Sequence, residues 1–106
     1  MKKEPIDFKK TNGMVPVIIQ DYKNGLIYML GYMNKLAFKE TKESGYVHFW
    51  SRSRNKLWMK GENSGNKLKV REIFIDCDND TLLIKTELEG KCVCHTGKIS
   101  CFFKNL

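Results

Sequence analysis

Short runs of apolar residues alternate with turn-forming residues along most of this chain of 106 residues, which is typical of β-strands joined by tight turns. The β-branched run 15–20 and the apolar, aromatic run 26–33 flank the turn-forming pair Asn24-Gly25, so they predict a hairpin. Because Pro16 has no N–H to donate to a sheet ladder, it predicts that the first of these strands lies near an edge.

One segment is rich in helix formers instead. Asn34 is a suitable N-cap and Ser44-Gly45 a natural stop, so residues 35–43 predict one short helix. Apolar and β-branched runs then return, separated by Ser, Asn, Gly or Asp clusters, and predict further strands at 46–50, 56–60, 67–75 and 81–88. Without an internal repeat or a linker, we expect a single α+β, strand-rich domain over 1–106, with a loosely held lead-in at 1–12.

Composition places the chain among globular proteins, since 42% of its residues are hydrophobic and 29% charged. Glu4, Pro5 and Asp7 interrupt the start where a signal peptide would be apolar, and no stretch approaches the roughly 18 apolar residues of a spanning helix. We therefore expect a cytoplasmic protein without a membrane partner. The formal net charge of +7 attracts anions but does not choose between nucleic acid, a membrane surface and a phosphorylated small molecule.

Carboxylates alternate along the segment between the last two predicted strands. If the backbone stays extended, Asp76, Asp78 and Asp80 project to one side and Cys77 to the other. A hard cation such as Mg²⁺ relieves the repulsion between such carboxylates and also coordinates phosphate oxygens. The alternative is a hairpin turn in which Asp78, Asn79 and Asp80 bond the local backbone, and the pattern leaves both open.

A second cluster places three thiols and a histidine in one glycine-containing loop. A reducing cytoplasm disfavours disulfides, and thiolate and imidazole are the ligands that Zn²⁺ prefers. Spacing alone favours Cys92, Cys94 and Cys101 as ligands and leaves Cys77 as a core residue. Cys92 and Cys94 form C-x-C, which fits a closed structural zinc site poorly, and inert core thiols are the remaining alternative. His95, in this polar loop, is the candidate catalytic residue.

Basic residues follow the aromatic strand at 46–50. The Ser/Arg turn offers the guanidinium groups of Arg52 and Arg54 to a phosphate, so these two are the candidate substrate-binding residues. Most lysines are expected to be solvated surface charges. His48 lies within the strand and is as consistent with a core histidine as with a catalytic one.

Several segments, in this order, resemble the phosphoribosyl-AMP cyclohydrolase family and together cover most of the chain. They are MVPVIIQD (14–21), LGYMN (30–34), HFWSRSR (48–54), LWMKGE (57–62), DCDND (76–80), CHTG (94–97) and SCF (100–102). Two positions depart from the family pattern, since Cys92 is an additional thiol and Asn63 stands where Thr is common. Some relatives carry a fused pyrophosphatase domain, and because this chain stops at Leu106 we expect that activity to be absent.

The resemblance implies a hydrolase acting on a cyclic amidine. Its small-molecule substrate is the nucleotide 1-(5-phosphoribosyl)-AMP, and cleavage of the N1–C6 bond opens the purine ring in histidine biosynthesis. The implied fold is a mixed, strongly bent sheet, or pseudo-barrel, completed as a homodimer that shares its zinc ligands between subunits. The implied ligands are Asp76, Asp78 and Asp80 for Mg²⁺, and Cys77, Cys94 and Cys101 for Zn²⁺.

Two other functions compete with this interpretation. A zinc deaminase would release ammonia, but its H-x-E and P-C-x-x-C elements are absent. A zinc-stabilised nucleic-acid-binding module is favoured by the net charge and by the turn at 51–54, whereas the acidic segment at 76–80 disfavours it. We therefore expect no nucleic-acid partner.

Overall fold

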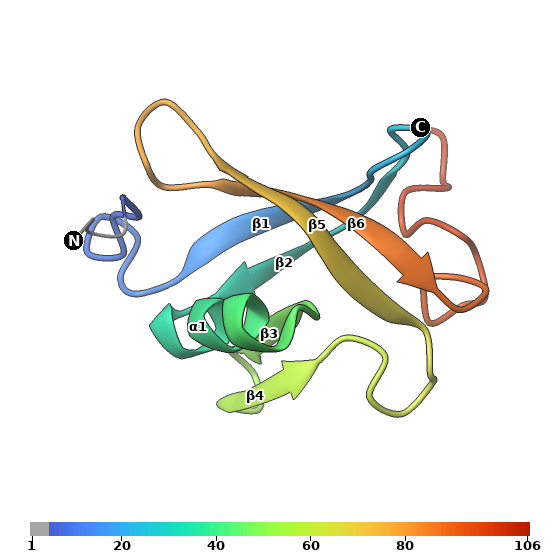
Figure 1. Cartoon of the computed structure of the whole chain (residues 1–106), viewed down its shortest axis with the longest axis horizontal. Coiled ribbons are helices and arrows are strands. Elements are labelled where there is room, and N and C mark those ends of the chain that lie inside the picture. Colours follow the sequence, from blue (N-terminus) through green and yellow to red (C-terminus); the bar gives the residue numbers. More distant parts are fainter. Residues whose placement is uncertain (1–4) are drawn as a thin grey trace.

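The first two strands of the chain form the predicted hairpin. The computed structural model describes residues 5–106, and in it β1 (Val15–Asp21) pairs antiparallel with β2 (Ile27–Met33) (Figure 1). The Asp21 carboxylate accepts hydrogen bonds from the main-chain N–H of Lys23 and of Asn24, which closes the turn. Gly25 has a φ of 77°, a left-handed conformation that glycine adopts without steric cost.

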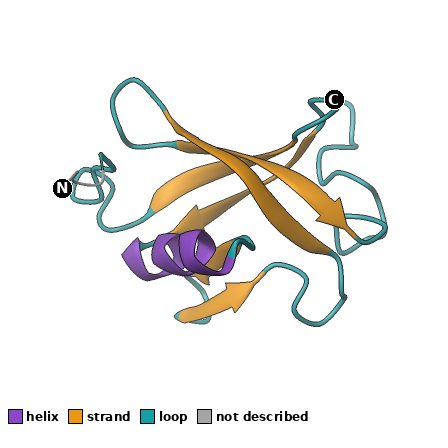
Figure 2. Ribbon diagram, in the orientation of Figure 1, coloured by secondary structure: helices purple, strands orange, loops and turns teal. Residues whose placement is uncertain are grey.

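A mixed four-stranded sheet forms around this hairpin. Its strand order is β2-β1-β6-β5, with β5 spanning Lys67–Ile75 and β6 spanning Leu82–Glu89. The β1–β6 pair is parallel, and the other two pairs are antiparallel. Figure 2 shows these strands twisting strongly across one another, so the prediction of a strand-rich α+β domain with a bent, mixed sheet is confirmed.

β1 lies near an edge of the sheet, next to the edge strand β2, but it is not itself an edge strand, because β6 pairs with its other side. Pro16 is opposite Tyr32 of β2, and the ladder with β6 begins one residue later, at Val17. The missing N–H of Pro16 is therefore tolerated at the start of an internal strand. The proline restricts its own position rather than the whole strand.

The predicted helix is α1 (Lys35–Ser44). The Asn34 side chain caps its first turn, and Gly45 ends it with a left-handed φ of 80° and an N–H bonded to the Thr41 carbonyl. Within residues 5–106, no helix is long and apolar enough to cross a membrane.

A separate two-stranded sheet packs beside α1. It consists of β3 (His48–Ser51) and β4 (Lys56–Met59), paired antiparallel. Phe49 of β3 is buried, and its ring centroid lies 5.3 Å from that of Trp58. The largest fully buried apolar side chains come from both sheets and from Val47 just before β3, and include Phe49, Ile19, Met33, Leu68, Leu82, Ile84, Val15 and Val17.

The lead-in expected to be loosely held is attached where the structure describes it, whereas residues 1–4 lie outside the described part. Phe8 is buried in the core, and the Asp7 N–H donates to the Asn79 carbonyl at 2.7 Å. This apolar anchor and this hydrogen bond attach the described part of the lead-in to the core and to the β5–β6 turn.

Candidate functional site

The three aspartates lie in the turn that joins β5 to β6 (Figure 1). The Asp76 N–H donates to the Thr81 carbonyl at 3.0 Å, and the Asn79 N–H donates to the Asp76 carbonyl at 3.2 Å. Asn79 has a φ of 65°, which Asn tolerates better than most residues. The backbone therefore forms a hairpin turn. Of the two alternatives left open by the sequence, the extended segment is not the one observed.

The turn nevertheless brings the carboxylates together. In the described part of the chain, Asp76, Asp78 and Asp80 are the group of three or more His, Cys, Asp or Glu side chains whose ligand atoms all lie within 4.8 Å of one another. We call this group the aspartate cluster. Its all-oxygen donor set at this spacing fits a hard divalent cation such as Mg²⁺.

Negative charge is crowded in the aspartate cluster. Partial desolvation acts to raise the pKa of Asp76, but hydrogen bonds from the N–H groups of Asp80 and Thr81, at 3.0 and 3.1 Å, lower it overall. The pKa of Asp78 is raised because its carboxyl group interacts first with Asp76 and then with Asp80. The cluster therefore favours a positive charge beside it.

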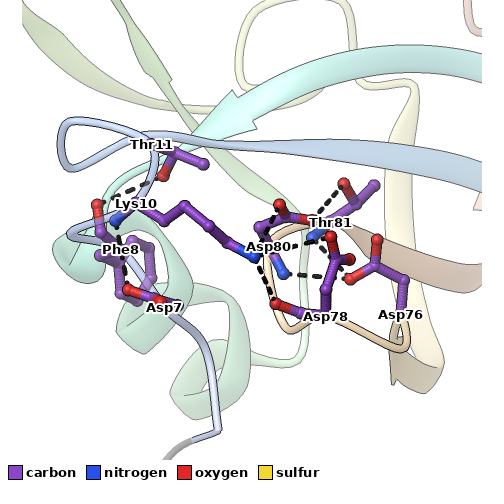
Figure 3. Close-up of polar contacts among 8 residues, drawn as sticks. All are labelled: Asp7, Phe8, Lys10, Thr11, Asp76, Asp78, Asp80 and Thr81. Atoms are coloured by element: carbon purple, nitrogen blue, oxygen red, sulfur yellow. Dashed lines mark hydrogen bonds and ion pairs between the residues drawn. The ribbon is translucent and has the colours of Figure 1, made fainter.

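Lys10 supplies such a charge from the lead-in. Its Nζ lies 3.2 Å from Oδ2 of Asp80 and 3.5 Å from Oδ2 of Asp78, and it donates to the Asp78 carbonyl at 2.8 Å (Figure 3). These contacts, led by the one with Asp80, raise the pKa of Lys10. Sequence reasoning missed this residue. Lys10 is 68 positions from Asp78 in the chain, and nothing in its local sequence distinguishes it from a solvated surface lysine.

Two of the predicted zinc ligands, Cys94 and Cys101, lie next to each other, and we call them the thiol pair. The Thr96 hydroxyl donates to Cys94 Sγ at 3.0 Å, and this contact, with a smaller one from the Cys101 thiol, lowers the pKa of Cys94. Partial desolvation of its thiol, and then the interaction with Cys94, raises the pKa of Cys101. The Cys101 N–H donates to the Tyr28 carbonyl at 2.8 Å, which holds this loop against β2.

Cys77 is not part of that arrangement within one chain. It lies in the turn before β6, and the thiol pair lies in the loop after it (Figure 1). The eight residues of β6 separate the two loops by about 25 Å of strand. Cys77 and Cys101 are both exposed.

Cys92 is the fourth thiol. Its Sγ is 3.6 Å from the Asn66 side-chain amide, whose oxygen accepts the Lys91 N–H at 3.0 Å. Asn66 thus ties the loop after β4 to the cysteine loop, a role that its place in a polar connection did not indicate.

A groove of about 540 Å³ opens beside the thiol pair. Its size is within the range of small-molecule sites. Three cations outnumber one carboxylate in its lining, which includes Arg54, Lys56, Lys60, Glu62, Asn63 and His95. His95, the predicted catalytic residue, is exposed in this groove and directly follows Cys94 in the chain.

Lys60 connects the groove to the thiol pair. Its Nζ donates to the Val93 carbonyl at 2.6 Å, next to Cys94. Its charge acts on both Cys94 and Cys101 in the direction that lowers their pKa, as a smaller contribution than those named above. Sequence reasoning did not predict this role, since most lysines were expected to be solvated.

The two predicted phosphate-binding arginines face different hollows. Arg54 lines the groove with His95, whereas Arg52 lines a neighbouring hollow of about 580 Å³. The Arg52 guanidinium lies 4.0 Å from the centroid of the Tyr32 ring, a cation–π contact. His48 is half-buried, with Nδ1 2.9 Å from the Tyr46 carbonyl oxygen.

Comparison with known proteins gives concordant matches. The family model described as phosphoribosyl-AMP cyclohydrolase matches residues 29–103. A phosphoribosyl-AMP cyclohydrolase of Solibacter usitatus is 54% identical over 101 residues, covering 95% of this chain and 80% of that protein. A phosphoribosyl-AMP cyclohydrolase of Listeria innocua is 57% identical over 98 residues, covering 92% of this chain and 90% of that protein. The histidine biosynthesis bifunctional protein HisIE of Buchnera aphidicola is 58% identical over 100 residues, covering 94% of this chain and 46% of that protein.

Proposed function

The chain belongs to the phosphoribosyl-AMP cyclohydrolase family, and from this premise we propose that it hydrolyses the N1–C6 bond of 1-(5-phosphoribosyl)-AMP with Zn²⁺ and Mg²⁺ as cofactors. The reaction opens the adenine ring in histidine biosynthesis, and we assign it to the cytoplasm. The observation that carries the proposal is the thiol pair beside a cationic groove of substrate size, with Lys60 lining the groove and donating to the Val93 carbonyl next to Cys94.

Cys94 and Cys101 would hold Zn²⁺ together with Cys77 of the partner subunit. The donor set fits, because two adjacent thiols with opposite pKa shifts give one thiolate readily and a second once a metal replaces its proton. When bound, Zn²⁺ supplies a Lewis acid that makes water nucleophilic near neutral pH. Lys60 offsets part of the negative charge that several thiolates bring to this loop.

Exposed apolar side chains near the separated thiols support a homodimer. Phe74 is 44% exposed three residues before Cys77, and Phe102 is 64% exposed directly after Cys101. Ile99 in the same loop is 47% exposed. An interface that covers these side chains would bury apolar surface and would also join the separated zinc ligands.

The groove suits an anionic nucleotide. Arg54 and Lys56 offer positive charge to a substrate phosphate, and Arg52 offers a further contact from the neighbouring hollow. Mg²⁺ at the aspartate cluster would neutralise another phosphate oxygen. Because Asp76, Asp78 and Asp80 share a turn with Cys77, a dimer that completes the zinc site brings a partner's aspartate cluster to the same groove.

The reaction adds one water molecule across the N1–C6 bond. The water oxygen bonds to C6, which keeps its amino group and becomes a carboxamide, and N1 leaves with the bond's electrons and keeps its ribosyl group. One water proton must be removed and one delivered to N1. The exposed imidazole of His95 is the groove's candidate for this transfer, since one ring nitrogen of an imidazole can accept a proton while the other donates one.

Incubating the zinc- and magnesium-supplied protein with 1-(5-phosphoribosyl)-AMP tests the proposal. We expect the purine absorbance to change as the ring opens, without ammonia release, and about one zinc per chain by metal analysis, since each chain contributes one full ligand set to the dimer. Ammonia release would instead indicate a deaminase. Absence of any reaction in the metal-loaded protein would contradict the assignment.

A further inference from the structure

Lys10 holds the place of a cation at the aspartate cluster. Its ammonium contacts Oδ2 of Asp80 and Oδ2 of Asp78 at 3.2 and 3.5 Å, and the Asp78 carbonyl at 2.8 Å (Figure 3). We propose that the Lys10 ammonium is an internal competitor of Mg²⁺ that must leave the aspartate cluster before the metal binds. This inference rests on the proposed magnesium site and adds a residue that sets its affinity.

The structure holds Lys10 in place through its neighbours. Phe8, two residues earlier, is only 7% exposed and fixes the segment to the core. The Asp7 N–H donates to the Asn79 carbonyl at 2.7 Å, which ties the segment to the β5–β6 turn itself. Asp7 Oδ1 also accepts the Lys10 N–H at 3.1 Å. The backbone of Lys10 is therefore already held beside the turn, so that docking of the ammonium costs only the conformational entropy of its side chain.

The two cations cannot share these oxygens. Mg²⁺ binds carboxylate oxygens at about 2.1 Å in a nearly ideal octahedron, and it would need the Asp78 and Asp80 oxygens that now face Lys10. An ammonium left within hydrogen-bond distance would crowd the metal and repel it. The apparent Mg²⁺ affinity is then lowered by the fraction of molecules in which Lys10 is docked.

The same contact benefits the metal-free protein. Asp76, Asp78 and Asp80 repel one another in the exposed turn, and Lys10 offsets part of that repulsion. Removing its charge should therefore destabilise the metal-free protein and tighten metal binding at once. If Lys10 only positioned the turn, its removal would instead lower both the stability of the metal-free protein and its affinity for the metal.

Direct metal binding tests the proposal, with Lys9 as the matched control. Lys9 is the adjacent exposed lysine. Zinc-loaded wild type, Lys10→Met, Lys10→Gln and Lys9→Met are titrated with Mn²⁺, followed by electron paramagnetic resonance, and with Mg²⁺ by calorimetry. We expect both Lys10 variants to bind about tenfold more tightly, and Lys9→Met to match wild type. Without divalent ions other than zinc, both Lys10 variants should melt lower than wild type, and saturating Mg²⁺ should close the gap.

The outcomes separate this inference from the proposed function. Wild type that binds Mn²⁺ while Lys10→Met and Lys10→Gln bind equally or more weakly would overturn the competition alone. Absence of Mn²⁺ binding at the aspartate cluster in every protein would overturn the magnesium site itself. Lys10→Gln keeps a donor for the Asp78 carbonyl, so it preserves the test if Lys10→Met does not fold.

Discussion

The aspartate cluster and the thiol pair lie beyond opposite ends of β6 (Figure 1), and they differ in how much of the metal site that we propose for each is supplied by one chain. The aspartate cluster is complete in one chain, since a single turn brings Asp76, Asp78 and Asp80 within 4.8 Å. The thiol pair supplies only Cys94 and Cys101. One region is built by local turn chemistry, and the other by contacts between distant loops.

The difference matters for how each region is stabilised. Hydrogen bonds within the turn fix Asp76, so the aspartate cluster is arranged in a single folded chain. The thiol pair is held by Lys60 from β4's end and by Tyr28 from β2. A third ligand for it must come from Cys77 of a second copy under our proposal. Substitutions in the two regions should therefore have effects of different size, and these effects should depend to a different degree on dimer formation.

The largest effect is expected for the zinc ligands. Cys101→Ser should lose zinc and lower kcat/KM by more than about 100-fold, since even changes to outer-shell partners cost 10–100-fold. Zinc content and turnover are measured together. Cys92→Ser is the matched control. Because Cys92 contacts Asn66, this variant should keep both its zinc and its turnover. Full turnover in zinc-depleted Cys101→Ser would contradict the zinc assignment.

Mixing inactive variants tests whether the zinc site crosses subunits. Cys77→Ser and Cys101→Ser are each expected to be inactive, but unfolding and refolding them together should restore about a quarter of wild-type activity. Half of the dimers would then be mixed, and each mixed dimer has one intact site of two. Mixtures as inactive as the separate variants would show that the ligands do not combine in this way.

A smaller effect is expected at Lys60. Lys60→Met should lower zinc affinity roughly tenfold, because it removes a positive charge beside two thiolates and the hydrogen bond to Val93. Competition with a chromophoric chelator measures the affinity, and Lys60→Arg should recover part of it. Lys56→Met, which removes an exposed charge from the same groove, should leave zinc affinity unchanged.

The smallest effect concerns pH and the aspartate cluster. The folded-state pKa of Asp76 is lowered, so its ionised form stabilises the fold above the unfolded-state pKa, and this stabilisation is lost as the pH falls through the folded value. The melting temperature of the zinc-loaded, magnesium-free protein should therefore fall below about pH 4. The Asp76→Asn variant should have a lower melting temperature than wild type at neutral pH, and its melting temperature should fall less as the pH is lowered. An identical pH profile for both proteins would argue against this role.

Local sequence signals predicted much of the fold. Asn34 and Gly45 mark α1 at the predicted place, and Asn24-Gly25 marks the β1–β2 turn. Pro16 indicated a strand near an edge but did not indicate that both sides of β1 are paired, since the restraint on one N–H says nothing about which strands flank β1. Phe8 also escaped prediction, because its burial depends on core residues that come later in the chain.

The sequence by itself determined the strands, the helix and, through its motifs, the family, and it offered the turn that gathers Asp76, Asp78 and Asp80 as one of two alternatives. Each of these depends on residues close together in the chain, where capping, turn chemistry and side-chain period decide the outcome. Only the tertiary structure decided that Lys10 faces the aspartate cluster, that Lys60 reaches the cysteine loop and that Cys77 lies apart from the thiol pair. Those contacts join segments far apart in sequence, and the packing of the sheet fixes which of them meet.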